Sequence, residues 1–72
     1  MKNERNIILG SNIKAERNRK RLSQFQLAEK INVSESTISL IERGLQTPSI
    51  LLVLDISKIL EIDINELLKN LL

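Results

Sequence analysis

Two short runs of apolar residues at helical spacing, both within residues 23–44, place the strongest constraint on how this chain folds. Isolated helices shorter than about 12–15 residues are marginal in water, so neither run is stable alone. Asn32 separates them, and asparagine readily adopts the left-handed conformation that ends a helix. The two helices are therefore expected to cross at a large angle, with the small residue Ala28 where their backbones approach. The apolar residues expected to hold the pair together are Leu27, Ile31, Val33, Ile38 and Ile41.

Capping residues set the ends of both helices. Ser23 begins the sequence SQFQ, a capping box in which the serine hydroxyl and the Gln26 amide satisfy free backbone N–H groups. Ser34 is the expected N-cap of the second helix, and Glu35 follows in its first turn, where a carboxylate complements the helix dipole. Gly44 closes this helix.

The rest of the chain predicts three further helices and no strand. Apolar spacing indicates a first helix over residues 7–20. Ser49 caps a helix over residues 50–60, and Asp63 starts a second capping box for a helix over residues 64–71. No stretch alternates apolar and polar residues with a period of two. The predicted fold is all-α, a single domain of five helices that takes in the whole chain.

Composition excludes several classes of site. The chain has no cysteine and no histidine, which removes disulfides, thiolate metal sites and the usual transition-metal ligands. Its carboxylates and lysines are placed as caps and surface charges, so we expect no enzymatic activity, cofactor, metal or small-molecule substrate. No apolar run reaches the roughly 18 residues of a membrane span, and the N-terminus lacks a signal peptide. The expected location is a reducing cytoplasm.

Charge is unevenly distributed along the chain. Residues 1–30 carry eight Lys and Arg against three Glu, a net charge of +5, whereas residues 31–72 carry three basic against six acidic groups, a net charge of −3. Such asymmetry indicates a polyanionic partner for the basic part, although a basic helix surface that is merely solvated would give the same count.

The outward face of the second helix in the pair carries mainly short side chains, namely Glu35, Ser36, Ser39 and Leu40. A helix with short polar groups on its exposed N-terminal half is suited to enter the major groove of DNA and meet base edges. This pattern makes nucleic-acid binding the leading hypothesis.

Four motifs in a fixed order carry a family resemblance. They are LSQ..LA from Leu22, VS.STIS.IERG from Val33, TPS from Thr47 and IL.ID..ELL from Ile59. Through them, residues 13–68 resemble the phage-repressor-type helix-turn-helix family, the Cro/C1 or XRE-like group. The resemblance implies a compact fold like that of lambda repressor, with the helix-turn-helix over residues 24–43. It also implies a transcriptional regulator, a repressor, that binds a double-stranded DNA operator.

The resemblance further implies roles for individual residues. Positions that match phosphate contacts are Ser23, Gln24, Ser34, Thr37 and Arg43. Positions that match base contacts are Glu35, Ser36, Ser39 and Leu40. Arg17 and Glu42 match a pair that forms a partly buried salt bridge between the first and third helices.

Each of these roles has a simpler alternative. Gln24 could be only a helix-cap residue, and Glu35 could serve only the helix dipole instead of meeting a cytosine amino group. Leu40 could pack on Leu45 instead of a thymine methyl, and the two serines could be plain solvent-facing residues. Arg43 could partner the C-terminal end of its own helix. The salt bridge could be two unrelated surface charges.

The last two predicted helices carry more leucine than a small core needs. The residues in question are Leu51, Leu52, Leu71 and Leu72. Several apolar residues that are exposed together usually mark an interface. We therefore expect a homodimer that binds a palindromic operator. Alternatively, these leucines dock another domain. A second functional class is then a protein-interaction module, such as an antitoxin or partner-binding domain.

Overall fold

The computed structural model describes residues 3–71, which form five α-helices and no strand, so the predicted all-α fold is confirmed. The helices are α1 (Glu4–Arg19), α2 (Gln24–Lys30), α3 (Glu35–Glu42), α4 (Ile50–Leu60) and α5 (Asn65–Leu68). They form a body of 28 × 24 × 20 Å. Within the described residues no helix is long and apolar enough to cross a membrane.

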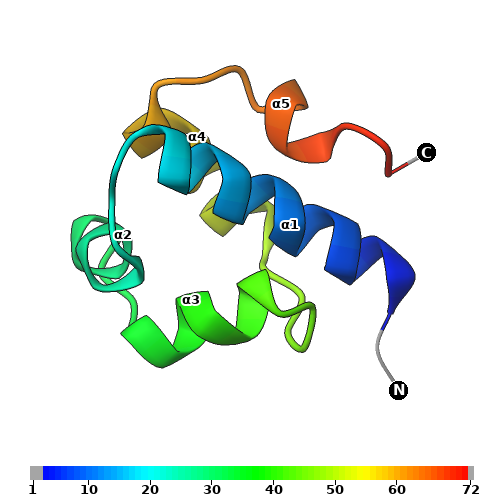
Figure 1. The fold of residues 1–72 in the computed structure, drawn as a ribbon, viewed down its shortest axis with the longest axis horizontal. Helices are drawn as coiled ribbons and strands as arrows, with labels where there is room; N and C mark the ends of the chain where they lie inside the picture. Colours follow the sequence, from blue (N-terminus) through cyan, green and yellow to red (C-terminus); the bar gives the residue numbers. More distant parts are fainter. Residues whose placement is uncertain (1–2, 72) are drawn as a thin grey trace.

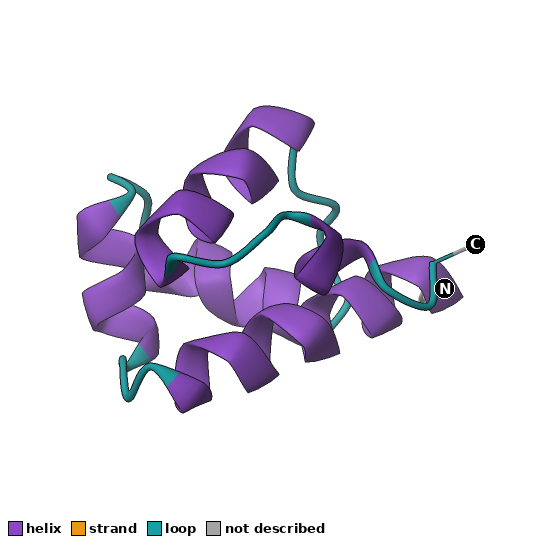
Figure 2. Cartoon of the chain, turned by 90° about the horizontal axis from the view of Figure 1, so that it is seen from above, coloured by secondary structure: helices purple, strands orange, loops and turns teal. Residues whose placement is uncertain are grey.

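Helix α1 is the central element of the packing. In Figure 1, α1 runs across the molecule in front of α4, with α3 on one side and α5 on the other. Figure 2 shows the same helices from above, so that the depth of Figure 1 can be seen. All five helices contribute to one buried core, made of Leu9, Ile13, Leu27, Ala28, Ile38, Ile41, Val53, Ile56, Leu60 and Leu67. The short helices are stable because each buries an apolar face here, which isolated peptides of their length cannot do.

The predicted N-caps of α2, α3 and α4 are confirmed. Ser23 and Gln26 form the complete capping box at the start of α2. The hydroxyl of Ser34 accepts the backbone N–H of Thr37, and that of Ser49 accepts the backbone N–H of Leu52, both at 3.1 Å. These bonds satisfy backbone groups that have no partner within the helix.

The turn between α2 and α3 is as tight as the sequence predicts. Asn32 has a φ of +59°, in the left-handed region that terminates a helix. Ala28 is buried at the crossing. Ile31 and Val33 flank the turn and pack partly buried against the core. At the other end of α3, Gly44 has a φ of +76° and closes the helix as expected.

The predicted bounds of α1 are wrong at the N-terminus. The helix begins at Glu4 instead of residue 7, because the side-chain oxygen of Asn3 accepts the backbone N–H of Arg5 at 2.8 Å and that of Asn6 at 3.3 Å. This first turn is polar, so apolar spacing gave no sign of it.

Helix α5 is shorter than predicted, and its capping box does not form. It covers Asn65–Leu68 instead of residues 64–71, and no side chain caps its N-cap position. The carboxylate of Asp63 accepts the backbone N–H of Asn65 at 2.8 Å, so Asp63 shapes the preceding turn. Asn12 on α1 holds the other end, because its side-chain nitrogen donates to the carbonyls of Leu67 at 3.0 Å and Lys69 at 2.9 Å.

Gly10 allows α1 and α3 to touch through their backbones. A Cβ atom at this position would collide with the carbonyl oxygen of Ile41 and lie 2.8 Å from that of Glu42. Both carbonyls are in the last turn of α3. The absence of a side chain at Gly10 therefore sets the distance between α1 and the C-terminal end of α3.

Candidate nucleic-acid interface

The exposed side of α3 and the start of α2 share a shallow depression of about 320 Å³. The residues that line it are Gln24, Glu35, Ser36, Ser39 and Arg43. All five were singled out from the sequence, three as base contacts and two as phosphate contacts. The fold thus brings both predicted kinds of contact residue onto one surface.

Helix α3 is divided lengthwise between the core and the solvent. Ile38 and Ile41 are buried, whereas Glu35 and Ser36 are exposed. Leu40 is half-buried and is not among the residues that line the depression. The packing face of α3 therefore leaves its N-terminal polar side chains accessible to a ligand.

The hydroxyl groups at the starts of α2 and α3 are held by capping bonds. Ser23 Oγ accepts the backbone N–H of Gln26 at 3.0 Å. Ser34 Oγ lies 2.8 Å from Thr37 Oγ1, in addition to its capping bond. A hydroxyl offers one donor and two acceptor positions, so capping and a phosphate contact are compatible.

Opposite charges lie at the two ends of α3. Glu35 is in the first turn and Arg43 directly follows the last helical residue, so both complement the helix dipole. Arg43 Nε donates to the backbone carbonyl of Ser39 at 3.3 Å, which draws the exposed side chain back along α3 toward the depression. The depression is therefore anionic at one end and cationic at the other.

Arg17 and Glu42 form a buried ion pair between α1 and α3. Arg17 Nε lies 2.7 Å from Glu42 Oε2, and Arg17 Nη2 donates to Glu42 Oε1 at 2.9 Å. The two side chains are only 8% and 2% exposed. The remaining guanidinium nitrogen, Nη1, donates to the carbonyl of Leu22 at 2.7 Å and to Asn18 Oδ1 at 3.2 Å. This geometry excludes the alternative of two unrelated surface charges.

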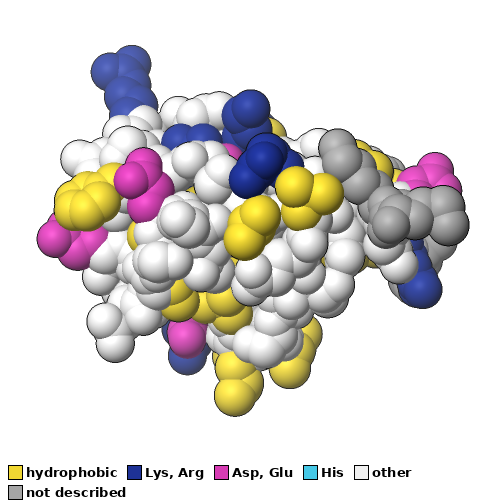
Figure 3. All heavy atoms as spheres, turned by 90° about the horizontal axis from the view of Figure 1, so that it is seen from below, with side chains coloured by type: hydrophobic (Ala, Val, Ile, Leu, Met, Phe, Trp, Pro, Cys, Tyr) yellow, Lys and Arg dark blue, Asp and Glu magenta, His cyan; other side chains and the backbone are white. Residues whose placement is uncertain are grey.

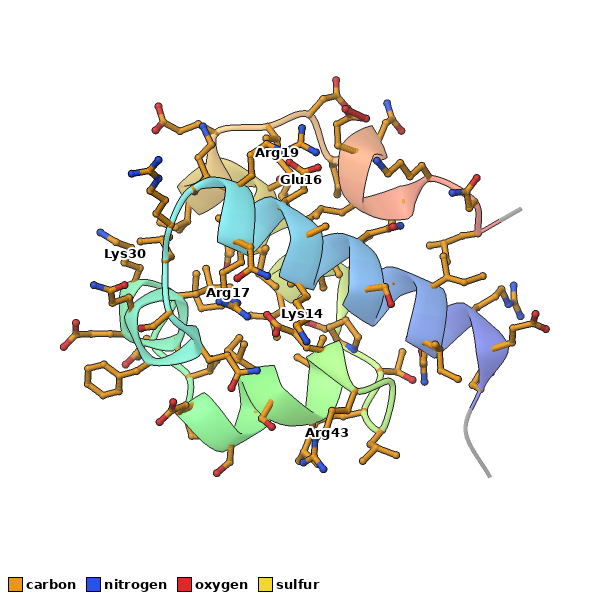
Figure 4. The ribbon with its side chains drawn as sticks, in the orientation of Figure 1. Lys14, Glu16, Arg17, Arg19, Lys30 and Arg43 are labelled. Carbon is orange, nitrogen blue, oxygen red and sulfur yellow. The ribbon has the colours of Figure 1, made fainter. Side chains whose placement is uncertain are left out.

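The charged side chains in the C-terminal half of α1 fall into two groups. Figure 4 shows Lys14 and Arg17 between α1 and α3, with Arg43 at the end of α3. Glu16 and Arg19 lie on the opposite edge of α1, where their side chains approach to 3.6 Å. Lys14 is exposed and places positive charge on the side of α1 that faces α3 in this view.

The leucines predicted to form a dimer interface differ in exposure. Leu51 is exposed, whereas Leu52 and Leu71 are partly buried against the core. Leu72 lies outside the described residues. Two of the four predicted interface leucines, Leu52 and Leu71, therefore pack at least in part against the core of this chain.

A different group of apolar residues on α4 is exposed. Ile50, Leu51 and Leu54 are 66%, 69% and 36% exposed, and their spacing places them on one face at the start of α4. Figure 3 shows hydrophobic side chains projecting from the face of the molecule that includes α3, with Lys and Arg side chains nearby.

Sequence reasoning missed two features near the start of α2. One is the bond from Gln24 Nε2 to Glu42 Oε1 at 3.0 Å, which joins residues on different helices. The other is Phe25, the single aromatic residue of the chain, which is 56% exposed beside Gln24. Its position in the first turn of α2 follows from the capping box at Ser23, so this signal was present in the sequence.

The family model described as helix-turn-helix matches residues 13–67. The curated relatives include the HTH-type transcriptional regulator SinR of Bacillus licheniformis, 42% identical over 64 residues, and SinR of Bacillus subtilis (strain 168), 42% identical over 62 residues. The matches cover 88% and 85% of this chain, but the chain spans only 58% and 56% of the length of these relatives.

Solved structures show the same architecture. A structure of SinR in complex with DNA has a TM-score of 0.79 and 40% identity, covering 85% of this chain and 98% of that one. The restriction-modification controller protein C.AhdI from Aeromonas hydrophila has a TM-score of 0.82 and 29% identity, covering 86% and 94%. From the family match, the helix order and the exposed face of α3, this chain belongs to the Cro/C1-type, XRE-like helix-turn-helix family of DNA-binding transcriptional regulators.

Proposed function

We propose that this chain binds double-stranded DNA in a sequence-specific manner and represses transcription in the cytoplasm. The observation that carries the proposal is the depression on the exposed side of α3, where side chains predicted to contact bases and phosphates meet. The structure of the relative SinR in complex with DNA supports the same partner. The N-terminal half of α3 enters the major groove, while α2 and the end of α3 lie against the strands on either side.

The chemistry of the depression supports this division of roles. Glu35 can accept a hydrogen bond from an exposed base amino group, such as cytosine N4, and Ser36 and Ser39 can donate or accept. Arg43 neutralises phosphate charge at the other end of the helix. Hydroxyls discriminate weakly between bases, so Glu35 contributes most of the base discrimination within the depression.

Selection of bound duplexes from a random pool tests the proposal. We expect enrichment of one sequence motif that wild-type protein binds more tightly than bulk DNA. Glu35→Gln changes the preference at one position of that motif, because an amide both donates and accepts where a carboxylate only accepts. Recovery of no motif, or an unchanged motif for Glu35→Gln, contradicts base reading at this site.

We propose further that two copies bind together. Ile50, Leu51 and Leu54 form an apolar face on α4, and this face replaces the C-terminal leucines as the centre of the proposed dimer interface. Two recognition helices about 34 Å apart would match successive major grooves, so the selected motif should be two-fold symmetric. Sedimentation that shows a monomer well above micromolar concentration contradicts the dimer.

A protein-interaction module is the second candidate function. The same apolar face of α4 favours it, as does a solved complex of the relative SinR with the protein SinI, which has a TM-score of 0.80 and 40% identity to this chain. Reversing the charge at Arg43 and Lys20 distinguishes the two functions. The double reversal should abolish DNA binding if the first function holds, and should leave partner capture intact if the second holds.

A further inference from the structure

Glu42 accepts more hydrogen bonds than its ion pair with Arg17 requires. Both of its oxygens accept from Arg17, at 2.7 and 2.9 Å, and this bidentate contact already supplies one full positive charge. Oε1 also accepts a third bond, from Gln24 Nε2 at 3.0 Å. Gln24 is the first residue of α2, whereas Arg17 belongs to α1. A role in joining α1 to α3 does not explain this third bond.

Gln24 connects the buried carboxylate to the surface of the interface. Its side chain is half-buried, and it lines the depression together with residues of α3. A carboxylate only accepts hydrogen bonds, so Glu42 requires the nitrogen of the Gln24 amide, and not its oxygen, to point inward. That nitrogen carries a second N–H, and this group is left for an acceptor in the depression.

We propose that Glu42 is a positioning residue for DNA binding, which holds the Gln24 amide so that its free N–H meets a backbone phosphate oxygen. The inference rests on the proposed function, since it assigns the phosphate contact of the same site. Holding one orientation before binding removes part of the side-chain ordering cost that association would otherwise carry. Through Arg17, the same network also ties Gln24 to the carbonyl of Leu22 just before α2.

A double-mutant cycle on DNA affinity tests the coupling. Arg17→Met with Glu42→Leu removes the buried pair without leaving an unpaired charge, and such apolar replacements often preserve stability. In the wild-type background, Gln24→Ala should weaken binding to the selected duplex about three- to tenfold, the effect of one hydrogen bond. In the background without the pair, Gln24→Ala should weaken binding less than about twofold, because the amide is no longer held.

Equal losses in both backgrounds would overturn the inference and leave the proposed function intact. A wild-type protein that binds no duplex would overturn the proposed function and this inference with it. Thermal melts of all four proteins ensure that only folded variants are compared.

The side-chain amide of Gln24 provides a second measurement that does not depend on the variants. In nuclear magnetic resonance spectra of the free wild-type protein, its two N–H protons should exchange with water at different rates, since one is bonded to a buried carboxylate. Two protons that exchange equally fast would show that the amide is not held, and would overturn the inference. In the double-mutant cycle, Ser36→Ala is the matched control and should weaken binding equally in both backgrounds, because Ser36 lines the same depression without a bond to Glu42.

Discussion

At the scale of single residues, Gly10 is the position least able to accept a side chain. Gly10→Ala should lower the free energy of unfolding by about 1–3 kcal/mol, because the new methyl group meets backbone carbonyls that cannot move independently of α3. Urea unfolding followed by circular dichroism measures the change. Ser11→Ala is the control, since Ser11 is exposed on the same helix. Equal stability of Gly10→Ala and wild type would contradict the close approach.

The buried ion pair leads to a second prediction about stability. Arg17→Met leaves the Glu42 carboxylate buried without a counter-charge and should cost about 3–5 kcal/mol. Adding Glu42→Leu should recover most of that loss, because both charges are then absent. Denaturant unfolding of the three proteins gives the comparison. If the double variant is as unstable as Arg17→Met, loss of packing and not the unpaired charge is responsible.

Individual capping residues were predictable from the sequence, but contacts between distant residues were not. Ser23, Ser34 and Ser49 each act on a backbone group within three residues, so their neighbours in the sequence identify them. Gly10 and Asn12 act on residues brought near only by the packing of α1 on α3 and α5. The ion pair was predictable only through the family resemblance, because spacing alone does not bring residues on different helices together.

At the scale of helices, α5 depends on a contact from outside itself. It has four residues and no side-chain N-cap, and Asn12 donates to carbonyls at and just beyond its end. Asn12→Ala leaves both carbonyls without this donor and should cost about 1–3 kcal/mol. In Asn12→Ala, backbone amide hydrogen exchange should accelerate, relative to wild type, more in α5 than in α3. Uniform acceleration along the chain would contradict a local role for Asn12.

The C-terminus of α4 offers a stabilising substitution. Glu61 caps the helix with a φ of +57°, a conformation that costs a non-glycine residue about 1–2 kcal/mol. Glu61→Gly should therefore raise the melting temperature, with a net gain of about 0.5–1 kcal/mol after the larger backbone entropy of glycine in the unfolded chain. Glu61→Ala is the control and should show no gain, because alanine meets the same steric restriction.

The order and number of helices were predictable, and their ends were less so. Apolar spacing and serine caps located α2, α3 and α4, where each helix buries a clear face. The start of α1 is polar and the end of α5 is set by Asn12, so neither end carries a signal in local apolar spacing. The residues that line the depression come from both α2 and α3. Only the family resemblance predicted that residues of these two helices would act on the same ligand.

At the scale of the whole molecule, the uneven charge predicts how DNA binding depends on salt. The logarithm of the DNA association constant falls linearly with the logarithm of the salt concentration, and each phosphate that the protein neutralises steepens this slope by about 0.9. Arg43→Ala should reduce the slope by about that amount. Lys58→Ala is the control of equal charge change, because Lys58 lines a separate depression with Lys30 and Asp55. Equal changes in slope would mean that net charge, and not the interface at α3, governs binding.

The contact at Gly10 has a consequence for how proteins of this design diversify. It holds α3 against α1 at Ile41 and Glu42, while Glu35 and Ser36 at the opposite end of α3 face solvent. Substitutions at the exposed end therefore leave the orientation of the helix unchanged. Under the proposed function, such a chain could exchange one target sequence for another in a few mutational steps, without repacking its interior.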